Sequence, residues 1–181
     1  MSTTSEVRRR LAELGLCLPP PSHRHEYLPF VAENHLIYVA GHAPFSGGDR
    51  QYRGRVGDTL DLSDGRAAAR LAVLGCLASL ETAICNLDAL TRIVKVNGYV
   101  HCVPGYEPLP EVMDGASELL VELFGERGRH ARTTVGVASL PGGVAVEIEM
   151  VAMSAQHGAL GRVNTAGTTP TTERIQEGFR Q

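Results

Sequence analysis

The stretch "HARTTVGVASLPGGVAVEIEM", residues 130–150, decides the fold of this chain. Most of it consists of small and β-branched residues, which favour strands over helices. Its middle holds Pro141–Gly142–Gly143, a combination typical of tight turns. The stretch therefore predicts two strands joined as a hairpin at this turn.

Three charged side chains stand out within this predicted hairpin: Arg132, Glu147 and Glu149. Side chains alternate between the two faces of a strand, and facing residues in an antiparallel pair point the same way. A symmetric turn would place Thr134 near Glu149 and Gly136 near Glu147. We therefore expect the arginine and both glutamates on one surface, with the Val and Ile side chains on the other.

Two interpretations of this polar surface are open. It could be a solvated sheet face whose exposed ion pair contributes little stability. It could also be a carboxylate-binding pocket, because arginine offers a planar fork of donors that fits a carboxylate with two bonds. A neighbouring glutamate could then position a water molecule or move a proton.

The composition is that of an ordinary globular chain. It has 181 residues, 43% of them hydrophobic and 20% charged, which suits one domain. A net charge of -3, no Trp, and only four Phe and five Tyr argue against a nucleic-acid partner. No uncharged apolar run reaches the roughly 18 residues of a membrane span, so we expect no membrane association.

The compartment can be inferred from the cysteines and the N-terminus. None of the four cysteines forms a CxxC pair, and Cys76 and Cys85 lie in an apolar helical run. They indicate free thiols in a reducing compartment. The start of the chain, "MSTTSEVRRRLAEL", has no apolar signal core. The expected location is the cytoplasm.

The remaining segments predict a single α+β domain over residues 1–156, with an extra N-terminal helix, followed by a tail over 157–181 without sustained periodicity. Thr3 and Glu6 have the spacing of a capping box for the first helix. The other expected elements are strands over 27–33, 36–41, 55–60 and 91–103, and helices over about 63–86 and 112–124. A bulge is expected at Asn97–Gly98, because glycine weakens a regular strand. This order favours an α+β sandwich with one mostly antiparallel sheet and helices packed on one face.

Histidines offer further candidates. His23 and His25 lie two residues apart in a Pro-rich segment, but no third ligand has metal-site spacing, so we expect no metal. His130 could add a proton-transfer group or a second donor beside Arg132, or simply lie at a strand edge. The same two interpretations are open for His42.

The stretch over 130–150 resembles the Rid (YjgF-like) family of reactive-intermediate deaminases. The family signature is an Ala-Arg-Ser/Thr segment, a Leu-Pro turn and a Val/Ile-Glu-Ile-Glu strand. The resemblance extends upstream through "EYLPFVAENHLIYVAGHAP" and "GCLASLETAICNLDALTRIVKVNGYV" and covers roughly residues 25–155. It implies a chorismate-mutase-like α+β sandwich that assembles as a homotrimer, with sites at the clefts between subunits.

The resemblance also implies an activity, the hydrolysis of imines and enamines to 2-oxo acids and ammonia without a cofactor. Arg132 would hold the carboxylate of a small metabolite, and Glu147 would place or activate the water. Gly41 would approach the substrate through its backbone, and Tyr27 would close the pocket. Thr134 lies where many members have a cysteine, with the main chain thought to matter more than the side chain.

The chain also departs from the family pattern. His42 follows Gly41 where glutamine is usual, and Asp114 lies where asparagine is common. The extra N-terminal helix and "FGERGRHAR" indicate a longer side branch. Imine or enamine deamination is the first functional hypothesis. A non-catalytic trimer that binds a small carboxylate is the alternative, and ribonuclease activity is disfavoured by the acidic charge and scarce aromatics.

Overall fold

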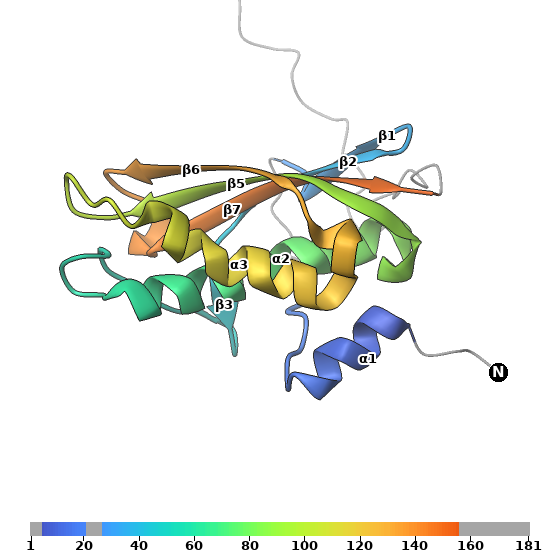
Figure 1. Ribbon diagram of the computed structural model, residues 1–181, viewed down its shortest axis with the longest axis horizontal. Coiled ribbons are helices and arrows are strands. Elements are labelled where there is room, and N and C mark those ends of the chain that lie inside the picture. Colours follow the sequence, from blue (N-terminus) through green and yellow to red (C-terminus); the bar gives the residue numbers. More distant parts are fainter. Residues whose placement is uncertain (1–4, 21–26, 156–181) are drawn as a thin grey trace, which may run out of the picture.

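The computed structural model describes residues 5–20 and 27–155, which form one sheet with helices on one of its faces (Figure 1). Five strands form the main sheet in the order β1-β2-β7-β5-β6, and β3 and β4 form a two-stranded ribbon. Neighbouring strands of the main sheet are antiparallel except for β5 and β6. The predicted α+β sandwich is confirmed. The elements are α1 (Glu6–Glu13), β1 (Phe30–Glu33), β2 (Leu36–His42), β3 (Phe45–Ser46), β4 (Asp49–Arg50), α2 (Leu62–Ile84), β5 (Leu90–His101), α3 (Leu109–Phe124), β6 (Ala131–Val137) and β7 (Val146–Ser154), with short 3-10 helices over Leu87–Ala89, Gly125–Gly128 and Pro141–Gly143.

The predicted hairpin between β6 and β7 is wrong. Both strands exist, but β5 lies between them and pairs with β6 in parallel and with β7 antiparallel. Val96 of β5 lies opposite both Arg132 and Met150. Because paired residues point the same way, Arg132 faces the helices with Met150. The segment over 138–145 is therefore a crossover past β5, and not a tight turn.

Helix α2 forms the centre of the helical layer. Asp61 caps its N-terminus in a capping box with Asp64. An 18-residue stretch of α2 is long and apolar enough to cross a membrane, but 72% of it is buried within the fold. Burial on several sides is typical of a core helix packed against a sheet and a neighbouring helix.

Strand β5 is regular at Asn97–Gly98, where a bulge was expected. Its register shifts lie earlier, between Leu90 and Arg92 and between Ile93 and Lys95. Gly98 instead leaves room for the side chain of Met113 on α3. A Cβ at this position would lie 2.8 Å from Cγ of Met113 and closer still to its sulfur.

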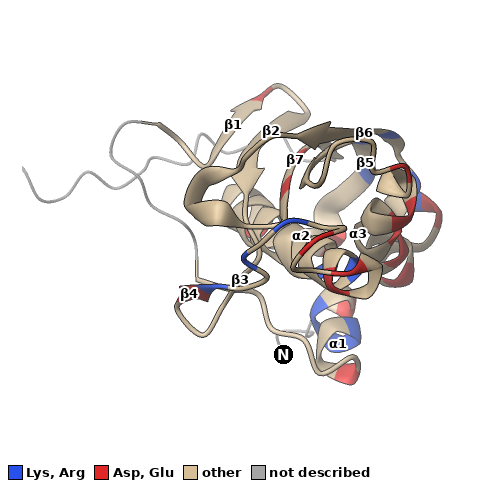
Figure 2. Cartoon of the chain, turned by 90° about the vertical axis from the view of Figure 1, so that its left-hand side faces the viewer, with Lys and Arg blue, Asp and Glu red and all other residues tan. Residues whose placement is uncertain are grey.

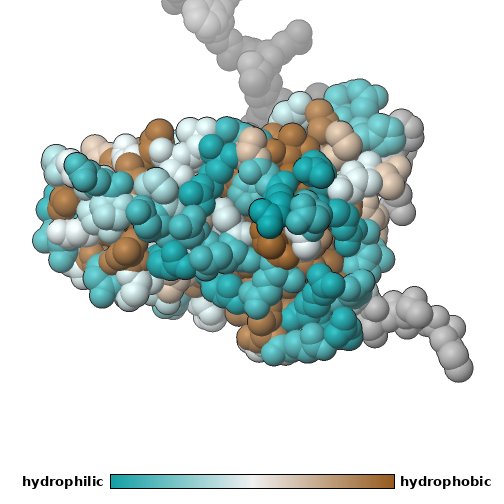
Figure 3. Space-filling model, viewed as in Figure 1, coloured by the Kyte–Doolittle hydropathy of each residue, from teal (hydrophilic) through white to brown (hydrophobic). Residues whose placement is uncertain are grey.

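Helix α1 packs its Val7 and Leu11 into the same core as α2 and α3. Its N-cap is Ser5, whose Oγ accepts a hydrogen bond from the backbone of Arg8. Thr3, the expected cap, lies outside the described residues, as does the predicted tail from residue 157. Seen from the side of Figure 1, the surface is largely polar, with scattered apolar residues (Figure 3).

The strand expected over 55–60 is not formed. These residues make turns with isolated bridges at Val56, flanked by Gly54 and Gly57 in left-handed backbone conformations. Two glycines of positive φ so close together interrupt a strand. The extended residues of this region are instead those of the separate β3–β4 ribbon.

Helices α2 and α3 cross closely at Gly115. A Cβ there would lie 2.8 Å from the carbonyl carbon of Arg66 and closer still to its oxygen. Gly115→Ala is expected to force the helices apart and to lower the free energy of unfolding by about 3 kcal/mol, as overpacking against backbone does. Urea denaturation measures this. Glu118→Ala on the exposed side of α3 is the control and should cost no more than about 1 kcal/mol. Equal losses in both variants would contradict the close crossing.

Candidate functional site

Three of the expected site residues line one cavity. Tyr27, Gly41 and Glu147 surround a hollow of about 580 Å³ beside the junction of β2 and β7. Pairing between these strands shifts register between Val39 and His42. The other lining residues are Pro19, Pro20, His42, Ala43, Phe45, Arg50, Gly75 and Pro141.

Glu147 lies half-buried against the backbone of Gly41. A Cβ at Gly41 would lie 3.0 Å from Cδ of Glu147 and closer still to Oε1, so only glycine leaves the carboxylate in place. Within residues 5–20 and 27–155, no hydrogen bond or ion pair engages this carboxylate. Burial raises the pKa of Glu147, and the charge of Glu149 raises it further. A carboxyl group with a raised pKa at a cavity wall is suited to exchanging protons with a ligand.

Glu149 differs from Glu147 in being held firmly. Its Oε1 accepts hydrogen bonds from Nδ2 of Asn97 and from the hydroxyl of Tyr99, both at 2.9 Å. These two donors fix the position of the Glu149 carboxylate. Glu149 therefore acts on Glu147 as a fixed negative charge.

His42 is a packing residue and not an exposed proton donor. Its ring lies against Gly75 of α2, where a Cβ would be 3.0 Å from Nδ1. Its Nε2 lies 2.9 Å from Oγ of Ser79. Burial lowers the pKa of His42 to about 4, so the ring is neutral at physiological pH.

This burial predicts a pH dependence of stability. The unfolded chain binds a proton at His42 near pH 6.5, whereas the folded chain resists it down to about pH 4. The stability contributed by neutral His42 is therefore complete above pH 6.5 and is lost as the pH falls towards 4, by up to about 3 kcal/mol. In His42→Asn this part of the pH dependence should vanish. Urea denaturation of both proteins between pH 4 and 7 measures it, and a constant difference across that range would contradict it.

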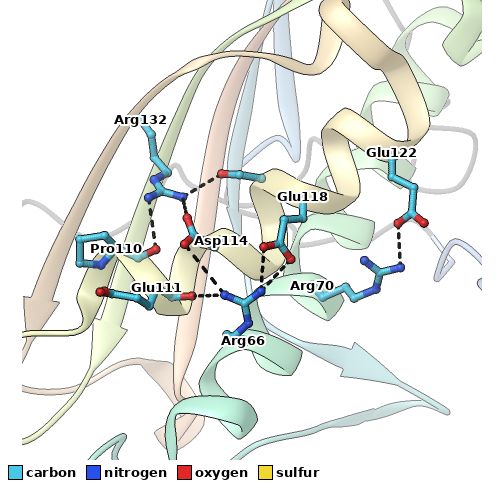
Figure 4. A network of polar contacts seen from close by, with 9 residues as sticks. Arg66, Arg70, Pro110, Glu111, Asp114, Glu118, Glu122 and Arg132 are labelled. Carbon is cyan, nitrogen blue, oxygen red and sulfur yellow. Dashed lines mark hydrogen bonds and ion pairs between the residues drawn. The ribbon is translucent and has the colours of Figure 1, made fainter.

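The other expected site residues gather at the opposite edge of the sheet. Arg132 of β6 donates from Nη1 to Oδ1 of Asp114 at 2.8 Å and to Oγ of Ser117 at 3.0 Å, and from Nη2 to the carbonyl of Pro110 at 3.2 Å (Figure 4). Asp114 also lies 3.9 Å from Nη1 of Arg66. The guanidinium is therefore fixed on the first turns of α3.

His130 belongs to the same group. Its Nδ1 lies 2.7 Å from the carbonyl of Gly128, so this nitrogen carries the proton and Nε2 accepts from Ser117 at 3.1 Å. Burial lowers the pKa of His130, and the charge of Arg132 adds to this lowering. His130 is thus a neutral ring that holds Ser117, and Ser117 in turn holds Arg132. Sequence reasoning missed Ser117, which lacks a motif of its own.

The structure divides the expected site into two groups. Tyr27, Gly41 and Glu147 line the cavity at β2 and β7, whereas Arg132, Asp114 and His130 lie on the helix side of β6. Thr134, two residues after Arg132, shares its direction and pairs with Gly98. Glu147 instead pairs with Tyr99 on the sheet's other face. The expectation that Arg132 and both glutamates share one surface is therefore wrong, because β5 separates the strands that carry them.

Arg50 is a further cavity residue that sequence reasoning missed. It lies in a polar, Gly-rich segment that predicted a loop, and no motif marked it. The structure places it on β4, opposite Phe45, with its side chain in the cavity of Glu147.

The sheet order and the helical layer on one face define a chorismate-mutase-like α+β protein, with a cavity beside the Gly41–Glu147 contact. Residues 8–152 match the family model described as "YjgF/chorismate_mutase-like, putative endoribonuclease". Protein TCP17 of Trypanosoma cruzi is 35% identical over 148 residues, covering 81% of this chain and 92% of the relative. The chain therefore belongs to the YjgF-like, or Rid, family.

Solved structures agree with this assignment. Atu1372, a protein of unknown function from Agrobacterium tumefaciens, has a TM-score of 0.79 and 37% identity, over 82% of this chain and 92% of that one. A "putative endoribonuclease" from Shewanella oneidensis MR-1 has a TM-score of 0.79 and 30% identity, over 83% and 99%. The Rid protein YyfA from Yersinia pestis has a TM-score of 0.54 and 25% identity, over 74% and 92%.

Proposed function

We propose that this protein hydrolyses a small imine or enamine carboxylic acid to a 2-oxo acid and ammonia, without a cofactor. The observation that carries the proposal is Glu147, a half-buried carboxylate held against Gly41 in a cavity and without a hydrogen-bond or ion-pair partner in the described part of the chain. Burying a carboxylate without a hydrogen-bond partner costs free energy. This cost favours a functional role for Glu147 over a structural one. Its raised pKa suits proton exchange with water and with a nitrogen leaving group.

The chemistry needs one acid/base group and an anchor. Ionised Glu147 takes a proton from water as the water oxygen adds to the imine carbon. Glu147 passes this proton to the imine nitrogen, which leaves a hydroxyl and an amine on the same carbon. The hydroxyl proton then moves through Glu147 to the amine nitrogen, the carbon–nitrogen bond breaks, and ammonia leaves while the carbonyl forms. Arg132 anchors the substrate carboxylate through its planar fork, which keeps the imine carbon beside the water.

Because Arg132 and Glu147 lie apart within one chain, the complete site requires a second protomer. We propose a homotrimer in which the β6 edge of one protomer closes the cavity of the next. Two features support it: the helices leave one sheet face uncovered (Figure 1), and charged residues are fewer on the strands than on the helical side (Figure 2). Apolar side chains exposed on or beside that face are those of Val31, Tyr38, Val135 and Met153. Exposed apolar patches of this kind mark contact surfaces.

Subunit complementation tests the activity and the shared site together. Arg132→Ala and Glu147→Gln homotrimers should each be inactive. Random co-assembly in equal amounts pairs an intact Arg132 with an intact Glu147 at roughly one site in four, so about a quarter of the activity should return. Imine hydrolysis is measured by 2-oxo acid release. Co-assembled trimers without activity, while the wild type is active, would reject the shared site.

A trimer that binds a small carboxylate without turnover is the second candidate. Asp114 and His42 favour it, because they replace the asparagine and glutamine usual in the deaminases. Ligand binding through Arg132 with no hydrolysis of any imine would establish it. We expect no ribonuclease activity, because the net charge of -3 and the glutamates beside the cavity would repel phosphates.

A further inference from the structure

Arg50 is a cation in the cavity of Glu147, and it has no partner among the residues that the structure describes. Its side chain lies against Gly142 of the β6–β7 connection, where a Cβ would be 2.8 Å from Cδ and 2.9 Å from Nε of the arginine. Gly142 also has a positive φ of 73°, so two constraints favour glycine at the position that makes room for Arg50. The guanidinium is thus held at the cavity wall by packing.

Most other arginines of the described chain are paired. Those in ion pairs are Arg8, Arg9, Arg10, Arg55, Arg66, Arg70, Arg129 and Arg132. Arg50 forms neither an ion pair nor a hydrogen bond within residues 5–20 and 27–155, although it is partly buried. A partly buried guanidinium of this kind leaves its donors available to a ligand.

We infer that Arg50 binds a second anionic group on the ligand, so that the substrate class is the imines of dicarboxylic 2-amino acids. The inference rests on the proposed function, in which Arg132 of the neighbouring protomer takes the carboxylate beside the imine carbon. Arg50 then takes the carboxylate at the far end, with the imine carbon between them and beside Glu147.

The charges in the cavity favour a carboxylate over a phosphate at Arg50. Among the lining residues that the structure describes, Arg50 is the sole Lys or Arg, and Glu147 contributes a negative charge when ionised. A phosphate carries close to two negative charges near neutral pH, and Glu147 would repel it. One guanidinium and one carboxylate match in charge and in their two-pronged geometry.

The test compares two ligands that differ at the far end. The first is 2-oxoglutarate, and the second is 2-oxo-5-methylhexanoate, in which an isopropyl group replaces the far carboxylate at similar size. Calorimetry should show tighter binding of 2-oxoglutarate to the wild type by about 10- to 100-fold. Arg50→Gln should remove that preference and leave the affinity for 2-oxo-5-methylhexanoate unchanged. Arg53→Gln is the matched control, because Arg53 is exposed and lies outside this cavity; it should keep the preference.

Hydrolysis of the corresponding imines, made with amino acid oxidases, gives the second readout. Arg50→Gln should lower kcat/KM for 2-iminoglutarate by the same factor and spare the neutral imine. Equal binding of both 2-oxo acids by the wild type, with hydrolysis intact, would overturn the role of Arg50 and leave the proposed activity standing. A preference for 2-oxoglutarate that depends on Arg50, with no imine hydrolysed, would support the ligand class and overturn the proposed reaction.

Discussion

Alanine in place of Arg132 is expected to abolish imine hydrolysis and nearly abolish binding of a 2-oxo acid. Charge-assisted bidentate bonds to a carboxylate are roughly twice as strong as neutral ones, and the proposed anchor beside the imine carbon depends on them. Arg132→Lys keeps the charge but loses the planar fork, so it should still weaken binding clearly, by about tenfold. Rates of 2-oxo acid release and calorimetric affinities measure both effects.

The loss should come from the site and not from the fold. The Arg132–Asp114 ion pair is partly exposed, with 23% and 41% of the two side chains accessible, so its removal should cost about 1 kcal/mol or less. Arg129→Ala removes a nearby exposed ion pair with Glu126 and is the matched control. It should retain full activity. Unchanged turnover in Arg132→Ala would reject the site outright.

Local patterns predicted most of the long helices and strands but not every pairing between them. Alternation along β6 and β7 fixes which side chains point together within each strand. It carries no information about which strand lies next to it, because that depends on contacts far along the chain. The Pro-Gly-Gly segment was interpreted as a hairpin turn for this reason. The same limit applies to Gly98, whose role is set by Met113 of α3, a residue distant in sequence.

The candidate site was predictable only through the family resemblance. Residue spacing alone placed Arg132 and Glu147 on one surface, but only because it predicted a hairpin between β6 and β7 that the structure does not contain. The resemblance selected Gly41 and Tyr27, and the structure places both beside Glu147 in one cavity. Neither residue spacing nor the family resemblance could predict Arg50 as a site residue. It becomes a candidate only through its packing against Gly142 and the absence of a partner among the described residues.

Glutamine in place of Glu147 is expected to lower turnover by about 100- to 10,000-fold, the usual contribution of a positioned acid/base group. The affinity for a 2-oxo acid should stay almost intact, because the anchor is untouched. Gly41→Ala should act in the same direction, since its Cβ would displace the carboxylate of Glu147. Single-turnover rates and calorimetry separate the two effects. Glu33→Gln, an exposed glutamate on β1, is the control.

Substitution of Glu149 distinguishes a catalytic role of Glu147 from a structural one, because only a catalytic Glu147 would set the pH dependence of the rate. Glu149 raises the pKa of Glu147 by charge repulsion, so Glu149→Gln should lower that pKa. The base must be ionised to accept a proton from water, and the rate should therefore rise with pH through the pKa of Glu147. The acidic limb of the pH–rate profile should move to lower pH in Glu149→Gln, while Glu147→Gln should lack this limb. Identical acidic limbs in the wild type and Glu149→Gln would remove Glu147 from the role of base.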